Sequence, residues 1–166
     1  MTKVIFKTLK SFLPLLRIKY TCTMFSNSSK YAIKAVLFLA VNSGEDNRVM
    51  VKEMAQPINV PQAYLAKLLQ ELSRKDIISS KKGPNGGFYL SEENGKLTLM
   101  DVVNVIDGND RFNTCLLSLE ECNADKPCPL HNLAGPSRLI FINSLSENTI
   151  IDFSEMIKKG EAFLPL

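Results

Sequence analysis

Residues 59–90, with the sequence NVPQAYLAKLLQELSRKDIISSKKGPNGGFYL, decide the fold of this chain. The turn Asn59-Val60-Pro61 precedes leucines at helical spacing, and Pro61 is well suited to be the first residue of a helix. Residues 77–82 and 88–90 are predicted as strands, because an Asn-Gly step between β-prone runs is a strong hairpin signal. The stretch therefore predicts a helix that leads directly into a hairpin and buries Leu65, Leu68, Leu69 and Leu72.

Two further helices are predicted upstream of this stretch. The first is capped by Ser28 or Ser29 and ends near residues 42–44, where Gly44 suits a C-terminal cap. The second covers residues 51–56 and is stopped by Pro57. The helix over residues 51–56 and the helix after Pro61 are joined by a turn of three or four residues, which is the helix-turn-helix arrangement. The hairpin that follows directly makes it a winged helix. The first helix has an apolar stripe of Tyr31, Ala32, Ala35, Val36 and Leu39.

The chain after the hairpin is predicted to be helical, apart from one loop that contains cysteines. Thr98 and Asp101 form a capping-box pattern, and Gly108 ends the helix that follows. A last helical region begins near Pro136, and residues 149–158 form a further short helix. The region after Pro136 has a narrow apolar seam of Leu139, Ile142 and Leu145. We expect a mostly α-helical chain with a small β-hairpin, divided into residues 1–23 (an N-terminal extension), 24–92 (the winged helix-turn-helix), 97–112 (a linking helix), 113–132 (the cysteine loop) and 133–166 (a C-terminal helical region).

Composition and charge place the chain among ordinary globular proteins. Of its 166 residues, 45% are hydrophobic and 22% are charged. Five basic residues and no acidic residue lie within residues 1–23, so the net charge of +3 becomes −2 for residues 24–166. Whole-chain charge therefore gives no argument for nucleic acid, and only a local basic patch could do so.

The N-terminal extension does not have the pattern of a signal peptide. Lys7 and Lys10 interrupt its apolar positions, and the stretch is too short to span a membrane. A surface-bound amphipathic helix is one interpretation. We expect instead that the extension precedes the domain and is poorly ordered, with Met24 as an alternative first residue.

The polar face of the helix after Pro61 is the predicted DNA-reading surface. Gln can pair bidentately with adenine, and Lys can reach guanine or phosphate. Phosphate contacts from the first helix would set the register on the duplex, and small residues at the hairpin tip would let the backbone approach it. The alternative is a solvated helix face beside a structural hairpin, but the hairpin lysines favour DNA. The predicted interface comprises Ser26, Lys30, Gln62, Ala63, Tyr64, Ala66, Lys67, Gln70, Lys81, Lys82, Gly83, Asn85 and Gly86.

Three of the four cysteines lie close together in the sequence, whereas Cys22 lies apart. The spacing is Cys115-x6-Cys122-x5-Cys128-Pro129-Leu130-His131, and His131 is the only histidine. Three thiols in a polar loop indicate metal ligation in a reducing compartment, and we expect a cytoplasmic protein. Zinc sites usually take closer cysteine pairs, whereas the longer gaps can surround a [2Fe–2S] cluster with histidine as the fourth ligand. Zinc, or a metal-free thiol sensor, remains the alternative.

The chain resembles the IscR/NsrR-type (Rrf) family of winged-helix regulators from about residue 24 to 153. The resemblance rests on residues 29–35 (SKYAIKA), 64–69 (YLAKLL), 82–90 (KGPNGGFYL) and the three-cysteine loop. It implies a homodimer whose long C-terminal helices pair, and transcriptional control that responds to iron–sulfur supply, iron, nitric oxide or redox state. It also implies that the thiolate ligands are Cys115, Cys122 and Cys128.

Two positions depart from the pattern of this family. The resemblance implies His131 as the fourth ligand, because it matches the position of the histidine ligand in IscR-like members. Other members use an acidic residue just before the first-helix tyrosine, where this chain has Lys30, a cation that cannot ligate, and this departure favours His131. Ala66 stands where a glutamate is common, so the operator preference of those members is not expected here.

The sequence argues against an enzyme and favours double-stranded DNA as the partner. The glycines of the hairpin do not precede a helix, so they do not form a phosphate-binding loop. A single histidine without an evident carboxylate pair makes acid–base catalysis hard to assemble. We expect no small-molecule substrate and no membrane partner.

Overall fold

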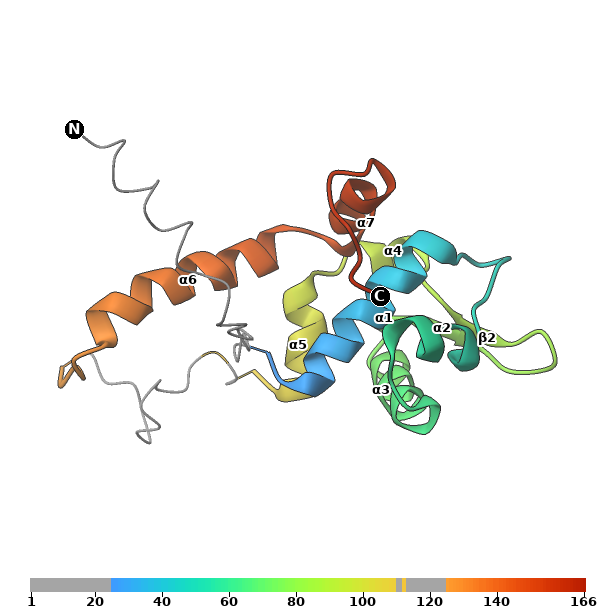
Figure 1. Cartoon of the computed structure of the whole chain (residues 1–166), viewed down its shortest axis with the longest axis horizontal. Helices are drawn as coiled ribbons and strands as arrows, with labels where there is room; N and C mark the ends of the chain where they lie inside the picture. Colours follow the sequence, from blue (N-terminus) through green and yellow to red (C-terminus); the bar gives the residue numbers. More distant parts are fainter. Residues whose placement is uncertain (1–24, 110–111, 113–124) are drawn as a thin grey trace, which may run out of the picture.

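The structure is a computed structural model, which describes residues 25–109, 112 and 125–166. It is mostly helical with a two-stranded antiparallel hairpin, which confirms the predicted fold class (Figure 1). The elements run in the order α1 (Asn27–Asn42), α2 (Val51–Ile58), α3 (Gln62–Arg74), β1 (Ser79–Lys81), β2 (Gly87–Tyr89), α4 (Glu92–Gly95), α5 (Leu99–Asp107), α6 (His131–Glu147) and α7 (Ile150–Lys158).

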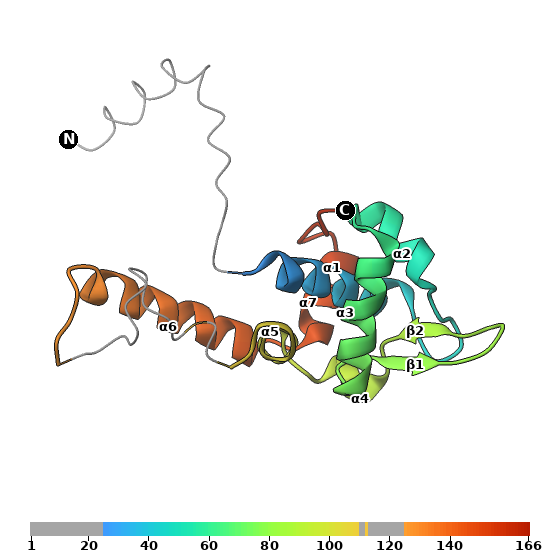
Figure 2. The ribbon, with the colours of Figure 1, turned by 90° about the horizontal axis from the view of Figure 1, so that it is seen from below.

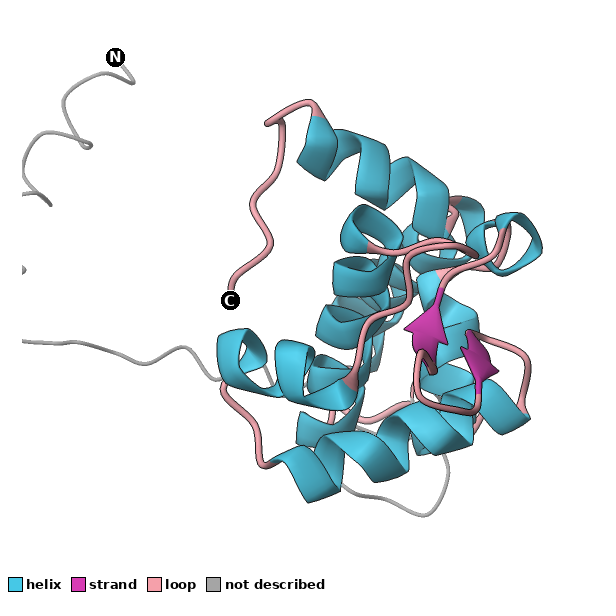
Figure 3. Cartoon of the chain, turned by 90° about the vertical axis from the view of Figure 1, so that its right-hand side faces the viewer, coloured by secondary structure: helices cyan, strands magenta, loops and turns pink. Residues whose placement is uncertain are grey.

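Helix α1 lies at the centre of the folded body. It packs against α2, α3, α5 and α7, and all of these contribute to one hydrophobic core (Figures 1 and 3). The apolar stripe predicted for α1 faces this core, with the half-buried Tyr31 packed against its edge and the other members buried. Fully buried side chains of the core include Leu39, Leu65, Leu69, Leu72, Val102, Val103 and Ile150. The four leucines predicted to be buried on α3 are all buried, which fixes its opposite face toward solvent.

Two predicted boundaries in the helix-turn-helix are wrong. The N-cap of α1 is Ser26, whose hydroxyl accepts a 3.0 Å hydrogen bond from the amide of Ser29, so neither Ser28 nor Ser29 caps the helix. Pro57 lies inside α2 and does not stop it. Proline removes one helical hydrogen bond, and α2 ends one residue later, at Ile58, because Asn59 adopts a left-handed conformation with φ of 58°.

The hairpin forms where it was predicted, but with shorter strands. Ser79 pairs with Tyr89, and Lys81 pairs with Gly87, so residues 82–86 form the connection. Residues 77 and 78, predicted as strand, lie before β1, and their side chains are buried in the core. Figure 3, which looks from the hairpin end, shows the two strands in front of the helices.

Helix α4 was missed by the sequence prediction, and it connects the hairpin to the body. Asn94 is buried on α4 and accepts hydrogen bonds from Ser79 of β1 and from Ser91, both at 2.7 Å. Its side-chain amide also donates to the carbonyl of Asp76 at 2.7 Å. The hairpin is therefore held at its base by a buried amide.

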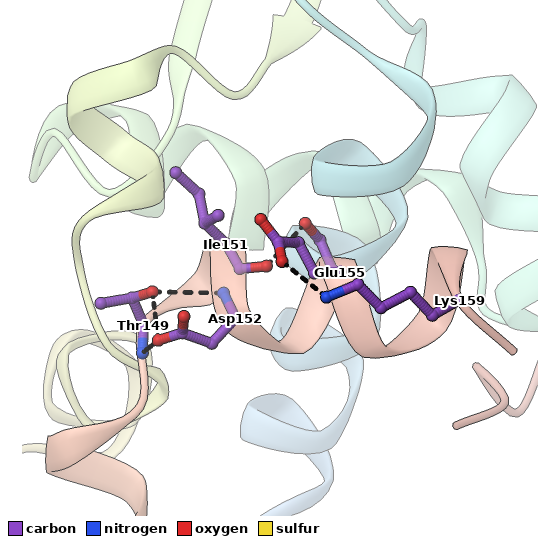
Figure 4. A network of polar contacts seen from close by, with 6 residues as sticks. Thr149, Ile151, Asp152, Glu155 and Lys159 are labelled. Atoms are coloured by element: carbon purple, nitrogen blue, oxygen red, sulfur yellow. Dashed lines mark hydrogen bonds and ion pairs between the residues drawn. The ribbon is translucent and has the colours of Figure 1, made fainter. Parts of the chain in front are cut away.

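Helices α5 and α7 both begin with a capping box, and their starts lie side by side. The predicted Thr98–Asp101 box is confirmed, and Thr149 with Asp152 repeats the arrangement at α7 (Figure 4). Thr98 and Thr149 form an isolated β-bridge, with the amide of Ile150 donating to the carbonyl of Leu97 at 2.8 Å. The capped end of α7 is thus joined to the start of α5.

Helix α6 begins five residues earlier than predicted and leaves the body as a long arm (Figures 1 and 2). Its first turn starts at His131, because Ala134 donates to the carbonyl of Leu130 at 2.9 Å. Pro136 lies inside the helix, where it removes one hydrogen bond without ending it. In the predicted seam, Leu145 is buried in the core, whereas Leu139 is exposed. No helix among the residues that the structure describes is both long and apolar enough to span a lipid bilayer.

Candidate nucleic-acid interface and cysteine segment

The solvent face of α3 contains most of the residues predicted to read DNA. Gln62, Lys67 and Gln70 are exposed there, opposite the buried leucines. Of the small residues on this helix, Ala63 is exposed and Ala66 is half-buried. Such a face combines amide and ammonium donors with small side chains, which lets a helix enter the major groove closely.

Tyr64, at the start of α3, is held by two residues of α1. Its hydroxyl shares a 2.7 Å hydrogen bond with the hydroxyl of Ser28. Its ring meets the ring of Tyr31 edge-to-face, with 6.1 Å between the centroids. The Tyr64 side chain is 37% exposed, so its hydroxyl can also face a ligand. The sequence identified Tyr64 but missed the role of Ser28, since no local pattern joins positions so far apart.

The tip of the hairpin presents Lys81, Lys82, Gly83 and Asn85 to solvent, with Gly86 half-buried. Gly86 donates a 2.9 Å backbone hydrogen bond to the carbonyl of Gly83. A Cβ on Gly86 would overlap the carbonyl oxygen of Lys81, so the tight connection requires glycine there. The predicted importance of this glycine therefore has a steric cause within the hairpin itself.

A groove of about 540 Å³ separates the C-terminal half of α3 from the hairpin. Lys81 and Lys82 line one side of it, and Gln70 and Arg74 line the other. The groove thus carries three cationic side chains, and Arg74 adds a cation that the predicted interface left out. Phosphate groups are the natural partner of such a surface.

The two predicted contacts from α1 differ in how they are placed. Lys30 is half-buried in the first turn of α1. Ser26 is the N-cap, and its hydroxyl already donates to a carboxylate oxygen of Asp107 at 2.6 Å. This contact joins the start of α1 to the end of α5.

The cysteine loop lies mostly outside the described residues, which include neither Cys115 nor Cys122. Cys128 is half-buried and makes no disulfide among the residues described, and His131 begins α6. The two are connected locally, since the amide of His131 donates to the carbonyl of Cys128 at 2.9 Å. Within the described part of the chain, no three potential ligands gather into a metal-binding group. The four-ligand site stays a prediction.

The sequence matches the Rrf2 family, described as an iron-dependent transcriptional regulator, over residues 25–156. The chain belongs to the Rrf2 family. A protein of Aquifex aeolicus (strain VF5), whose name describes an HTH-type transcriptional regulator, is 37% identical over 111 residues, or 66% of this chain and 76% of that protein. The HTH-type transcriptional regulator IscR of Enterobacter sp. (strain 638) is 24% identical over 135 residues, or 80% of this chain and 82% of that protein.

Solved Rrf2-type structures share the fold of this chain. The structure of CymR, the global cysteine regulator of B. subtilis, superposes with a TM-score of 0.63 at 23% identity and covers 79% of this chain and 95% of its own. T. potens IscR superposes with a TM-score of 0.60 at 19% identity, covering 82% of this chain and 90% of its own. Rrf2 proteins are transcriptional regulators, not enzymes; they bind DNA and typically act as dimers. This Rrf2 protein is accordingly a transcriptional regulator.

Proposed function

We propose that this protein binds operator DNA through α3 and the hairpin. The observation that carries the proposal is the polar face of α3, which lies beside a groove lined by Arg74, Lys81 and Lys82. With α3 in the major groove, Gln62 and Lys67 would meet base edges, and the hairpin lysines would meet the phosphate backbone or the adjacent minor groove. A duplex fits this pair of elements because one backbone strand separates the two grooves.

We further propose that two copies pair through α6. Three large apolar side chains of this helix are exposed, namely Leu133 at 74%, Leu139 at 61% and Ile140 at 69%. Exposed apolar residues in one region usually mark an interaction surface, and the helix stands away from the body, where a second copy can reach it (Figure 2). Because Rrf2 proteins typically act as dimers, we take a second copy of this chain to be the partner that covers this surface.

The proposed sensor is a [2Fe–2S] cluster held by Cys115, Cys122, Cys128 and His131. The donor set suits iron, because thiolates are the usual ligands of such clusters and imidazole can replace one of them. Of these donors, Cys128 and His131 are both half-buried at or just before the start of α6, and the Rrf2 family is described as iron-dependent. When bound, the cluster would supply redox and oxidant sensitivity. Thiols that bind iron suit a reducing compartment, so we place the protein in the cytoplasm.

DNA binding is tested by selection of duplexes from a random-sequence library with the purified full-length protein. We expect an enriched site whose two halves mirror a dimer. The selected duplex should bind with salt-sensitive affinity, and the Gln62→Ala and Lys67→Ala variants should bind it more weakly. Failure to enrich any sequence, with and without iron and sulfide, would contradict the proposal.

The cofactor is tested by anaerobic reconstitution with iron and sulfide. We expect visible charge-transfer absorption and about two iron and two sulfide per chain. The Cys128→Ala variant should lose this absorption, whereas Cys22→Ala, at the cysteine outside the spaced set, should keep it. Zinc without sulfide would instead indicate a structural metal, and a colourless protein that forms disulfides with peroxide would indicate a thiol sensor. Either result would overturn the cluster and leave the DNA-binding proposal standing.

A further inference from the structure

Asp107, the last residue of α5, accepts two hydrogen bonds from the N-cap residue of α1. One of its carboxylate oxygens accepts a 2.6 Å hydrogen bond from the hydroxyl of Ser26, and the other accepts from the amide of Ser26 at 3.3 Å. The same Ser26 hydroxyl caps α1 by accepting from Ser29. Ser26 therefore holds the first turn of α1 on one side and Asp107 on the other.

That same turn of α1 holds the start of α3. Ser28, two residues beyond the cap, bonds to the Tyr64 hydroxyl at 2.7 Å, and Tyr31 meets the Tyr64 ring at 6.1 Å. A continuous set of contacts thus runs from Asp107 through Ser26 and the first turn of α1 to Tyr64 on α3. Helix α1 packs against both α5, which carries Asp107, and α3, which carries Tyr64 (Figure 1).

Asp107 also lies shortly before the segment that contains the cysteines. Gly108 caps α5 with φ of 84°, and Phe112 is buried shortly beyond it. The Phe112 ring packs 6.0 Å from Phe25 and 5.9 Å from Phe141 of α6, measured between centroids. The end of α5 and Phe112 are therefore joined to residues 25 and 26, which directly precede α1, by one polar and one aromatic contact.

We propose that Asp107 is a positioning residue for DNA binding, which acts through Ser26 and Ser28 to orient the Tyr64 hydroxyl. This inference rests on the proposed function of α3. A tyrosine hydroxyl has one proton, so when Ser28 donates to it, the phenolic proton can point to a phosphate oxygen of the duplex. Loss of the Asp107–Ser26 contact would let the first turn of α1 shift and misdirect that proton.

The inference is tested by a double-mutant cycle on affinity for the selected duplex. Ser26→Ala removes the hydroxyl that joins Asp107 to α1, and Tyr64→Phe removes the hydroxyl at the other end while keeping the ring. Each single variant should bind the duplex more weakly. The affinity of the double variant should be at least about threefold higher than the two single losses multiplied together would give, because the first substitution already removes part of what the second would disturb. Ser26→Thr retains the hydroxyl and should bind nearly as the unmodified protein does.

Two controls separate positioning from general damage. Ser26→Ala combined with Lys82→Ala, on the hairpin and outside this set of contacts, should give losses that simply multiply. Asp107→Ala leaves the Ser26 cap in place, so its cycle with Tyr64→Phe should show the same coupling even if Ser26→Ala is poorly folded. Circular dichroism at the assay temperature identifies any variant that is unfolded.

The outcomes distinguish this inference from the proposed function. If the unmodified protein binds DNA and the losses from Ser26→Ala and Asp107→Ala each multiply with that of Tyr64→Phe, the positioning role is wrong and the DNA-binding proposal stands. If the unmodified protein binds no DNA, the proposed function fails and this inference fails with it.

Discussion

Val49 and Phe88 exchange two backbone hydrogen bonds, each 2.9 Å long. This isolated bridge adds the segment before α2 to the outer side of the hairpin, next to β2. Gly87 lies against the same segment, and a Cβ there would be 2.8 Å from the Val49 carbonyl oxygen. The position of the hairpin is therefore set by backbone packing as well as by its own strand pair.

Gly87→Ala should destabilise the protein and move the hairpin. The added methyl group meets backbone, which cannot rotate away, and overpacking of this kind costs about 1–3 kcal/mol. Urea denaturation measures the loss. The control is Gly44→Ala, where a Cβ would have no neighbour within 4 Å and the change should be within about 0.5 kcal/mol. Equal stability of the two variants would contradict the steric role of Gly87.

Ile150→Ala should be one of the more damaging substitutions in α7. Ile150 is fully buried in the core, and truncation of a buried isoleucine costs about 2–5 kcal/mol. The matched control is Met156→Ala on the same helix, where the side chain is 41% exposed. Thermal denaturation should separate the two clearly. Similar small losses would mean that α7 is not an integral part of the core.

Replacement of Leu139 and Ile140 together by aspartate should convert a dimer to a monomer. Both side chains are exposed on α6, so the folded protomer should keep its stability while the apolar contact between copies is lost. Sedimentation equilibrium reports the mass. Phe163→Asp, at a 90% exposed position near the C-terminus, should leave the mass unchanged. A dimer that survives the double substitution would place the interface elsewhere.

The capping box of α7 should contribute to stability in a pH-dependent way. Hydrogen bonds from the Thr149 side chain, and then from its backbone amide, hold the pKa of Asp152 below its ordinary value of 3.8 (Figure 4). Because the folded pKa is the lower one, this contribution is complete above the ordinary value and is lost as the pH falls through the lowered pKa.

The Thr149→Ala variant tests this assignment. It should raise the pKa of Asp152, measured by NMR titration of its carboxyl carbon, because the larger of the two hydrogen-bond effects is gone. Glu155→Gln breaks the 3.0 Å ion pair with Lys159 on the same helix and should move the pKa of Asp152 much less. An unchanged pKa in Thr149→Ala would show that the hydroxyl is not the cause.

Features with a local sequence pattern were predictable, and those that depend on distant contacts were not. The buried face of α3, the hairpin after residue 78, and the Thr98–Asp101 box all follow from spacing or from adjacent residue types. Ser26 was missed as the cap because three candidate serines lie close together, and only the contact with Asp107 distinguishes it.

Prolines and short helices show the same limit. Local pattern predicts a helix boundary at Pro57 and at Pro136, but each proline lies inside a helix that loses one hydrogen bond and continues. Helix α4 has no apolar periodicity and is fixed by the buried Asn94. Among the interface residues, the sequence identified Tyr64, but the link from Ser28 needed the folded chain.

Salt dependence of binding to the selected duplex is the most direct measurement of DNA recognition by α3 and the hairpin. The logarithm of the affinity should fall linearly with the logarithm of the salt concentration, because phosphate contacts release counterions. Lys82→Ala should lower the affinity and reduce the slope by about one, whereas Lys158→Ala, at an exposed position of α7, should change neither. Salt-independent binding, or equal losses from both lysines, would contradict the account.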